Sequence, residues 1–590
     1  MKNLLTIIGF CFCFGLSAQS YVFDYLNVNN INARFQSTGF MFSNPSTNNA
    51  SYEYIQGSGK HTIYAGNIWI SGLDANNQLR VAANMFFPQG EFYPGPVGSA
   101  TTYATSHFDY NFVWKITKQE IDDFIAWYSC GLNPNCVQNS SYAVPNVIQN
   151  WPGNGDVSLG QSPIIAPFID HNSDGIYNPI DGDYPCIKGD MALFTVYNDD
   201  YAHLNSGGDS LRMEIRAMHY GYNSADSALA NTIFSEYTLI NFSNETYSDL
   251  NVGIWLDPDI GCSEDDYVGC DVQRSLSYAY NADLADNNGC NGGIGFGYHP
   301  PAQGLVVLAG PLQDADNLDN SFGISGGESI NGCGYGDGII DNERVGMSSF
   351  IGYDRTLPPN TFGSPTSPLD FYNYMNGVWR DGTHLVYGGF GHSSTAGSTT
   401  IETNYMFPGT SDNIYFFGTD GVDPGFDWSE ETPGLGTANP KGDRRTSTNM
   451  GAFTMQPNDV QQFTVAHITA RDYVDSSNLA SVALLKSYTD DIRNFYACEI
   501  TNSCVSQISS INNYDNIQLS IYPNPATGIV NVLAEYKLET LTIFSITGQQ
   551  LIYKVNTDNS IDFSQLPKGI YLLKVEFENG KSVTKSVVKN

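Results

Sequence analysis

The sequence predicts a mainly β protein, built as several β-sandwich domains with few helices. Of the 590 residues, 13% are aromatic, and 58 glycines and 27 prolines divide the chain into short segments. Such a chain has ample apolar material for cores, while its turn residues favour short strands. Runs of alternating apolar residues bounded by turn pairs, clearest near the C-terminus, support the same fold class.

Two segments carry helical signals. Thr117-Lys-Gln-Glu120 has the spacing of a capping box and predicts a helix over 120–128. Residues 476–495 place apolar side chains at roughly helical spacing, at Leu479, Val482, Leu485 and Ile492. Strands are predicted for most of the remaining chain. Residues 232–242 and 250–256 are expected to form a hairpin of two long, mostly buried strands.

Residues 515–590 predict a small antiparallel β-sandwich of their own. Apolar residues alternate in two runs, Leu541 and Ile543 in the first and Tyr571, Leu573, Val575 and Phe577 in the second. Asn579-Gly580 is a hairpin signal, because both central residues of a type I′ turn need a positive φ. Pro523 and Pro525 cannot donate ladder hydrogen bonds, so Tyr522-Pro-Asn-Pro525 is expected to mark a strand end.

This segment resembles the type A C-terminal sorting domain of the type IX secretion system. Three motifs carry the resemblance in the expected order: Tyr522-Pro-Asn-Pro525, Leu566-Pro-Lys-Gly-Ile-Tyr-Leu572 and a final strand containing lysine. The resemblance implies an immunoglobulin-like sandwich that the export machinery recognises. The implied sorting-signal residues are Tyr522, Pro523, Asn524, Pro525, Pro567, Gly569 and Tyr571. An ordinary immunoglobulin-like module is the alternative.

The N-terminus carries a matching export signal. Lys2 supplies a positive charge, 4–16 is an apolar stretch too short to span a bilayer, and Leu16-Ser-Ala18 is a small-residue cleavage site. Residues 1–18 are therefore interpreted as a signal peptide. No later segment has eighteen uninterrupted apolar residues, so no transmembrane segment is expected in the mature chain. The expected destination is the extracellular space or the outer-membrane surface, reached through the periplasm.

The chain is strongly acidic upstream of the sorting domain. It has 61 acidic and 26 basic residues and a net charge of −35, while 515–590 contains seven of each. This charge disfavours nucleic acid and anionic lipid as partners and suits divalent cations. Residues 19–504 are too many for one ordinary core, so two or three modules are expected there. The Ser- and Asn-rich residues 505–514 are interpreted as a linker to the sorting domain.

The cysteines predict disulfides. Removal of the signal peptide leaves nine of the eleven cysteines, an odd number in an oxidising compartment, so one thiol is expected to remain free. Close spacing favours the pairs Cys130–Cys136, Cys262–Cys270 and Cys498–Cys504. Cys186, Cys290 and Cys333 are left, and spacing does not pair them.

The clearest chemical motif is the loop 170–181, Asp-His-Asn-Ser-Asp-Gly-Ile-Tyr-Asn-Pro-Ile-Asp. Oxygen side chains at positions one, three, five and twelve, with glycine at six, suit a cation of the size of Ca²⁺. The predicted ligands are Asp170, Asn172, Asp174, the Ile176 carbonyl and Asp181. Nearby prolines argue against flanking helices, so the loop resembles the helix-free calcium loops of dockerin-type or thrombospondin-type repeats. The alternative is a turn whose side-chain oxygens bond their own backbone.

A second acidic cluster is a weaker candidate for structural calcium. Its carboxylates lie within fifteen residues of one another, and like charges at this density are costly unless a cation screens them. A solvated acidic loop is the alternative. The predicted ligands are Asp257, Asp259, Asp265, Asp266 and Asp271.

No catalytic residue is predicted. The histidines are scattered without a zinc-binding pattern. Gly391-His-Ser393 resembles the start of a nucleophile elbow, but Thr395 stands where a glycine is needed, which favours a loop. Trp69, Trp379 and Trp428 could stack on sugar rings, although core packing is the commoner use of such residues.

The upstream region resembles segments of large sorting-domain proteins of Bacteroidota-type bacteria whose activity is not established. The resembling segments include Trp69-Ile-Ser-Gly-Leu-Asp74 and Gly182-Asp-Tyr-Pro185. The sequence therefore favours a secreted or cell-surface structural, adhesion or binding protein, stabilised by calcium, with a surface glycan or protein as its ligand. The alternative is a secreted hydrolase acting on polysaccharide or protein.

Overall fold

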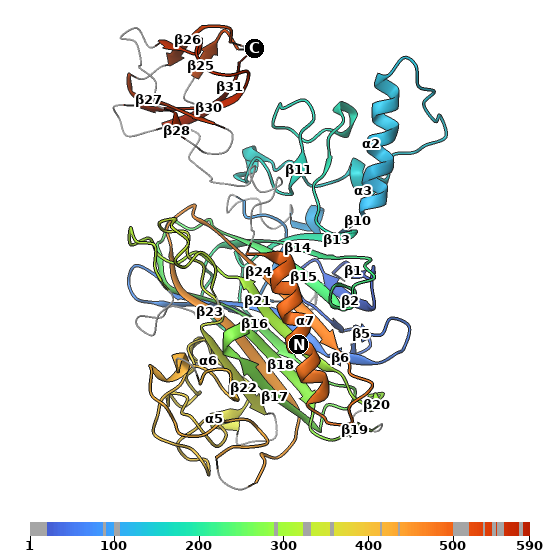
Figure 1. Ribbon diagram of the computed structural model, residues 1–590, viewed down its shortest axis with the longest axis vertical. Coiled ribbons are helices and arrows are strands. Elements are labelled where there is room, and N and C mark those ends of the chain that lie inside the picture. The colour runs from blue at the N-terminus through green and yellow to red at the C-terminus, as the bar shows by residue number, and fades with distance from the viewer. Residues whose placement is uncertain are drawn as a thin grey trace, which may run out of the picture. The chain divides into compact units, whose positions relative to one another are not determined.

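The computed structural model describes most of the chain (Figure 1). The described residues are 21–86, 90–98, 107–287, 293–321, 332–354, 359–413, 416–434 and 437–498, then 519–524, 526–534, 537–545, 550–551, 560–577 and 582–589. The predicted signal peptide 1–18, the linker 505–514 and Pro525 lie outside them. The chain divides into two compact units, Met1–Ser510 and Ile511–Asn590.

The first unit is built on a nine-stranded antiparallel sheet. Its strands, in spatial order, are β10 (Trp114–Thr117), β13 (Met191–Asn198), β14 (Met213–Gly221), β15 (Thr232–Asn241), β24 (Val460–Ala470), β21 (Ala302–Ala309), β18 (Leu276–Asn281) and β17 (Asp266–Asp271), with β9 (Tyr93–Pro94) paired to β13. The sheet thus combines strands that are as far apart in the sequence as residues 93 and 470. The chain up to Ser510 forms one compact unit.

Further sheets complete this unit. A five-stranded sheet has the order β22 (Ser349–Asp354), β23 (Arg444–Met455), β16 (Tyr247–Asp257), β7 (Ala65–Leu73) and β8 (Leu79–Ala83). A four-stranded sheet has the order β1 (Phe23–Leu26), β2 (Ile31–Gln36), β5 (Tyr52–Tyr54) and β6 (His61–Ile63). Two-stranded pairs are β3 (Ser43–Asn44) with β4 (Asn49–Ala50), β11 (Phe168–Ile169) with β12 (Tyr184–Pro185), and β19 (Ala285–Asp286) with β20 (Gly297–Tyr298).

The nine-stranded sheet is buried on both faces, which explains its long apolar runs. Side chains of one face, such as Leu193 and Ile215, share a core with Trp69 and Ile254 of the five-stranded sheet. Alternate side chains, such as Phe194 and Tyr220, join a second core that contains residues of α7 (Ala480–Tyr496). The β-rich class predicted from the sequence is confirmed.

Few helices accompany the sheets. The α-helices are α2 (Lys118–Leu132), α3 (Asn146–Gln149), α4 (Ser227–Ala230), α5 (Pro359–Phe362), α6 (Pro368–Met375) and α7, and the 3₁₀ turns are η1 (His107–Tyr110), η2 (Val157–Leu159), η3 (Pro179–Asp181), η4 (Val272–Arg274) and η5 (Phe417–Thr419). The predicted capping box begins α2, where Thr117 and Glu120 satisfy each other's backbone N–H groups. Among the described residues, no helix is both long and apolar enough to cross a bilayer.

The hairpin predicted over 232–256 is wrong. Strand β15 pairs with β14 and β24, whereas β16 pairs with β23 and β7 in the other large sheet. Both strands are buried on both faces, so each finds its partners among strands distant in sequence. The chain crosses between layers at 242–246 instead of turning back on itself.

The second unit is a two-sheet sandwich, as the resemblance implied. One sheet contains β25 (Leu519–Tyr522), β26 (Ile529–Ala534) and β29 (Ser560–Asp562), and the other β28 (Gln550–Leu551), β27 (Leu538–Ser545), β30 (Gly569–Phe577) and β31 (Ser582–Lys589). The predicted apolar residues, including Leu541, Ile543 and Leu573, form its core. Strand β25 ends at Tyr522, where the two prolines predicted a strand end.

The disulfides agree with the predicted pairs in part. Cys130 and Cys136 are bonded as expected. Cys270 is a free buried thiol, so it does not pair with Cys262, which is itself disulfide-bonded, as is Cys186. Strand β17 separates Cys262 from Cys270, and its extended residues 266–270 span about 13 Å, well beyond the reach of a disulfide.

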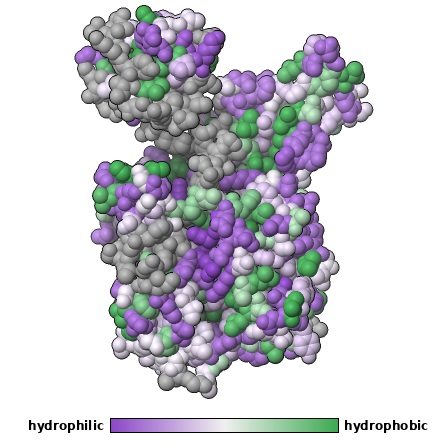
Figure 2. Space-filling model, viewed as in Figure 1, coloured by the Kyte–Doolittle hydropathy of each residue, from purple (hydrophilic) through white to green (hydrophobic). Residues whose placement is uncertain are grey.

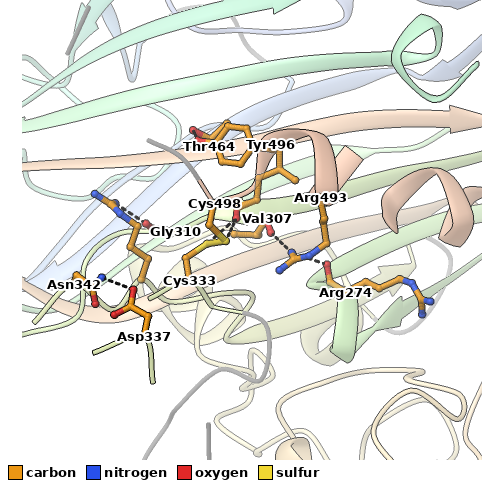
Figure 3. The surroundings of a disulfide bond; sticks show 12 residues. Arg274, Val307, Gly310, Cys333, Asp337, Asn342, Thr464, Arg493, Tyr496 and Cys498 are labelled. Carbon is orange, nitrogen blue, oxygen red and sulfur yellow. Dashed lines mark hydrogen bonds between the residues drawn. A yellow bond between two sulfur atoms is a disulfide. The ribbon is translucent and has the colours of Figure 1, made fainter. Parts of the chain in front are cut away.

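The third predicted pair is also corrected. Cys498 bonds to Cys333 and not to Cys504, which lies outside the described residues. Figure 3 shows why: the last residues of α7, Arg493 and Tyr496, are held against the sheet by hydrogen bonds to Val307 and Thr464. This contact places Cys498 beside the loop that carries Cys333. Because Cys333 and Cys498 are 165 residues apart, the spacing of the cysteines could not indicate this pair.

Candidate cation sites and sorting domain

The loop 170–181 lies between β11 and β12, is exposed over 171–176 and ends in η3. No α-helix flanks it, as its prolines predicted. Gly175, the position-six glycine, has φ +79°. That left-handed conformation favours glycine and produces the sharp turn that a cation-binding loop needs.

The Asp and Asn side chains of this loop accept hydrogen bonds from the loop's own backbone N–H groups. Asp170 accepts hydrogen bonds from the N–H groups of Asp174 at 3.2 Å and Gly175 at 2.7 Å. Asn172 accepts from Asp174 at 3.0 Å, and Asp174 accepts from Ile176 at 2.8 Å. The contacts of Asn172 and Asp174 are Asx turns, the alternative use of the same oxygens. Each carboxylate oxygen keeps a further lone pair, so these oxygens remain suitable ligands for a hard cation.

Sequence reasoning missed Asp183, two residues beyond the loop. Its buried carboxylate accepts from the N–H groups of His171 and Asn178, each at 2.8 Å. Burial raises the pKa of Asp183, and the carboxylates of Asp170 and Asp174 raise it further. Asp181, the position-twelve residue, instead accepts from the amide of Asn178 at 2.6 Å. The third acid of the loop, beside Asp170 and Asp174, is therefore Asp183, whose only sequence signal is its place after Gly182.

The second predicted cluster does not form one site. Asp271 caps η4 and pairs with Arg274 at 3.0 Å and Lys486 at 3.1 Å, so its charge is already neutralised. It lies at the opposite end of β17 from Asp265 and Asp266, because the six residues of β17 are fully extended.

Asp257 and Asp259 belong to a separate group with Asp443. Their oxygens lie within 4.8 Å of one another. Arg445 pairs with Asp257 at 3.5 Å and with Asp443 at 3.4 Å, so a guanidinium supplies a cation to this group. The structure thus gives these two carboxylates a protein partner in place of the shared cluster predicted for them.

Asp265 lies beside Asp286, which the sequence did not single out, and both act electrostatically on Asp266. An oxygen of Asp265 and one of Asp286 lie within 4.8 Å of each other. Burial, together with Asp286, raises the pKa of Asp265 to about 6, and burial raises that of Asp266 well above its usual value. The sulfur of Cys262 also lies within 4.8 Å of these two oxygens, but it is bound in a disulfide.

A hydrogen-bonded chain of Asp381, His392 and Ser394 was also missed. His392 Nε2 donates to Asp381 at 3.1 Å, while the backbone N–H of Ser394 donates to His392 Nδ1 at 3.1 Å. Because Nδ1 accepts that N–H, it carries the lone pair, and the Ser394 hydroxyl donates to it at 2.6 Å. The segment is a loop, as predicted, and the serine that contacts His392 is Ser394.

The tryptophans considered for sugar stacking are buried. Trp69, Trp379 and Trp428 each have 0% of their surface exposed and belong to the main core. The commoner use of tryptophan, core packing, applies to all three.

The sorting-signal residues hold strand ends together in the second unit. Asn524 accepts a hydrogen bond from the N–H of Val588 in β31 at 2.8 Å. Tyr571 is buried, packs edge-on against Phe563 and donates its hydroxyl to the carbonyl of Pro567 at 2.8 Å. Tyr522 remains half exposed.

Comparison with known proteins agrees with this description of the second unit. Residues 520–589 match the family described as the secretion system C-terminal sorting domain. The resemblance inferred from the motifs is thereby confirmed. The sorting domain indicates export through the type IX system to the cell surface or the extracellular space.

Two enzymes share partial similarity with the chain. A stretch of 71 residues is 32% identical to beta-agarase D of Zobellia galactanivorans, and it covers 12% of this chain and 15% of the agarase. A solved polysaccharide lyase aligns with 72% of this chain and 39% of its own, at 9% identity and a TM-score of 0.18. The chain therefore spans far less than two thirds of either protein.

Proposed function

We propose that this exported protein is a calcium-stabilised structural, adhesion or binding protein whose ligand is a surface glycan or protein. The observation that carries the proposal is the loop 170–183, in which Gly175 provides the sharp turn and the carboxylates of Asp170 and Asp174 act electrostatically on that of Asp183. In the extracellular space, where calcium is plentiful, such a loop supports a structural role for the ion.

The surface of the first unit supports a polar ligand. On the face shown in Figure 2, hydrophobic residues occur in small separate groups among hydrophilic ones. The strongly acidic composition adds repulsion against anionic partners. A neutral or cationic polar surface, such as a neutral glycan, fits this face better than a lipid or a nucleic acid.

Binding to a glycan and protein array tests this proposal. The exported protein is probed with calcium and with EDTA, and the array is also analysed for hydrolysis products. We expect retention on defined ligands without turnover, and weaker retention in EDTA. Turnover of a bound ligand would contradict a non-catalytic role.

The chain Asp381–His392–Ser394 favours one alternative, a secreted hydrolase. Burial tends to raise the pKa of Asp381, but hydrogen bonds from Thr383 and His392 outweigh it and hold the pKa below its usual value. A charged Asp381 orients the imidazole so that Nδ1 can take the Ser394 proton as Oγ attacks an acyl carbon. Ser394 is exposed, so such a nucleophile is accessible.

Labelling with a fluorophosphonate probe decides between the two candidates. A hydrolase of this kind would be labelled at Ser394, and Ser394→Ala would abolish the signal, while the matched variant Ser393→Ala would keep it. The non-catalytic proposal expects no labelling of the wild-type protein. In that case the contact of Ser394 with His392 is a local turn.

A further inference from the structure

Four buried side chains gather where β17 and β18 meet the loop that precedes them. Asp266, the first residue of β17, and Asn281, the last of β18, are direct partners in the antiparallel ladder. Side chains of such partners project on the same side of the sheet, about 5 Å apart. Asp265 precedes β17, and Asp286 ends β19.

Backbone N–H groups fix two of the carboxylates. Asp266 Oδ2 accepts from Ile260 at 3.0 Å. Asp286 accepts from Cys262 at 3.1 Å and from Phe296 at 2.5 Å. These contacts set the orientation of both groups without using all of their oxygen lone pairs.

Three oxygens at this place are buried without a donor from the described residues: Oδ1 of Asp265, Asp266 and Asn281. Asp266 and Asn281 are completely buried and Asp265 is 7% exposed. The Asn281 amide is not reversed, because its Nδ2 donates to the Asp283 carbonyl at 2.9 Å. A buried oxygen that meets neither a donor nor a cation is destabilising, and more so when it is charged.

The hydrogen bonds of two neighbouring cations go to other groups. Lys441 forms its ion pair with Asp283, and Arg471 donates to backbone carbonyls of His299 and Phe296. The carboxylates of Asp265 and Asp286 both interact electrostatically with that of Asp266. Lys441 partly offsets the charge of Asp265, and Lys60 and Arg471 partly offset that of Asp286.

We propose that Asp265, Asp266, Asp286 and Asn281 form a buried binding site for a divalent hard cation, calcium. All four offer oxygen, the ligand atom that calcium prefers, and ligands around one ion at about 2.4 Å lie at separations like those of Asp265 and Asp286. Calcium fits better than magnesium, because magnesium keeps most of its waters. This site is independent of the loop 170–183 and does not rest on the proposed function.

Calcium stoichiometry of the exported protein tests the site. The protein is stripped with EDTA, returned to calcium, dialysed and analysed for bound metal. Asp266→Asn keeps the side-chain shape and removes the charge of a fully buried ligand. Asp265→Asn does the same for the slightly exposed ligand. Asp283→Asn is the matched control, since the Asp283 side chain is about half exposed and pairs with Lys441.

We expect Asp266→Asn and Asp265→Asn each to lose one equivalent of calcium, while Asp283→Asn loses none. Asp174→Ala reports the loop 170–183 separately and is expected to leave this equivalent in place. Unchanged stoichiometry in both test variants would overturn the proposal. If Asp266→Asn were then also as stable as wild type in EDTA, the three buried oxygens without a donor would be held together by a shared proton and not by a metal ion.

Discussion

Arg444 and Glu430 form a two-pronged ion pair inside the first unit. Nε and Nη2 of Arg444 donate to the two oxygens of Glu430, each at 2.9 Å, and both side chains are almost completely buried. Arg444 also donates to Asp354, and Glu430 accepts from the N–H of Val268. The pair thus ties β22, β23 and β17 to the loop that carries Glu430.

Removing one partner of this pair is expected to be costly. Glu430→Gln leaves the buried guanidinium without one of its carboxylates, and loss of a partner from a buried pair costs about 3–5 kcal/mol. Urea unfolding of the exported protein measures this free energy. Glu431→Gln is the control, because Glu431 is partly exposed and its hydrogen bond from Asn478 survives the change. Equal stability of the two variants would contradict the assignment.

His203 is expected to make stability depend on pH. Its two ring nitrogens face backbone carbonyls of Val81 at 2.7 Å and Asp199 at 2.9 Å. A neutral imidazole has one N–H, so both contacts need the charged form. Burial opposes that charge, but the carboxylates of Asp199 and Glu91 outweigh it, and the pKa of His203 is raised.

Because the folded pKa of His203 lies above the unfolded value of about 6.5, its stabilisation is complete below that pH. It is lost as the pH rises through the folded pKa. The melting temperature of wild type should therefore fall more between pH 6 and 9 than that of His203→Gln. Parallel profiles for the two proteins would rule out a charged His203.

The disulfide Cys333–Cys498 is expected to stabilise the unit far more than Cys130–Cys136. The first pair is separated by 165 residues and the second by 6. Loop-closure entropy gives about 5 and about 2 kcal/mol. Denaturant unfolding of the two double Cys→Ser variants measures the difference. A larger loss from the Cys130 and Cys136 variant would contradict this ranking.

Deletion of 515–590 is expected to trap the protein in the periplasm. Fractionation of cells expressing the deletion measures this, since residues 520–589 match the sorting-domain family. As a control, the same segment fused to a periplasmic reporter should send the reporter to the cell surface. Surface delivery of the truncated chain would refute the assignment.

The sequence predicted the local features well. The capping box at Thr117 and Glu120, the strand end at Tyr522 and the close disulfide Cys130–Cys136 are all present, because each depends on neighbouring residues. Periodicity also identified α7, which covers 480–496.

Long-range pairing could not be predicted in the same way. Strands β15 and β16 are buried on both faces, so no alternation indicates which sheet each one joins. The same limit hid the pair Cys333–Cys498, whose members are separated by 165 residues that include several strands. Asp286 looks like any other acid in a polar loop until the fold brings it beside Asp265.

Calcium-dependent melting of the exported protein tests the central claim most directly. A structural ion raises stability by about 2.7 kcal/mol at a hundredfold excess over its Kd, so calcium should raise the melting temperature relative to EDTA. Asp174→Ala should reduce the gain. Asp156→Ala removes a comparable exposed Asx cap outside the loop and should keep it. No difference between calcium and EDTA, or an undiminished gain in Asp174→Ala, would contradict the account.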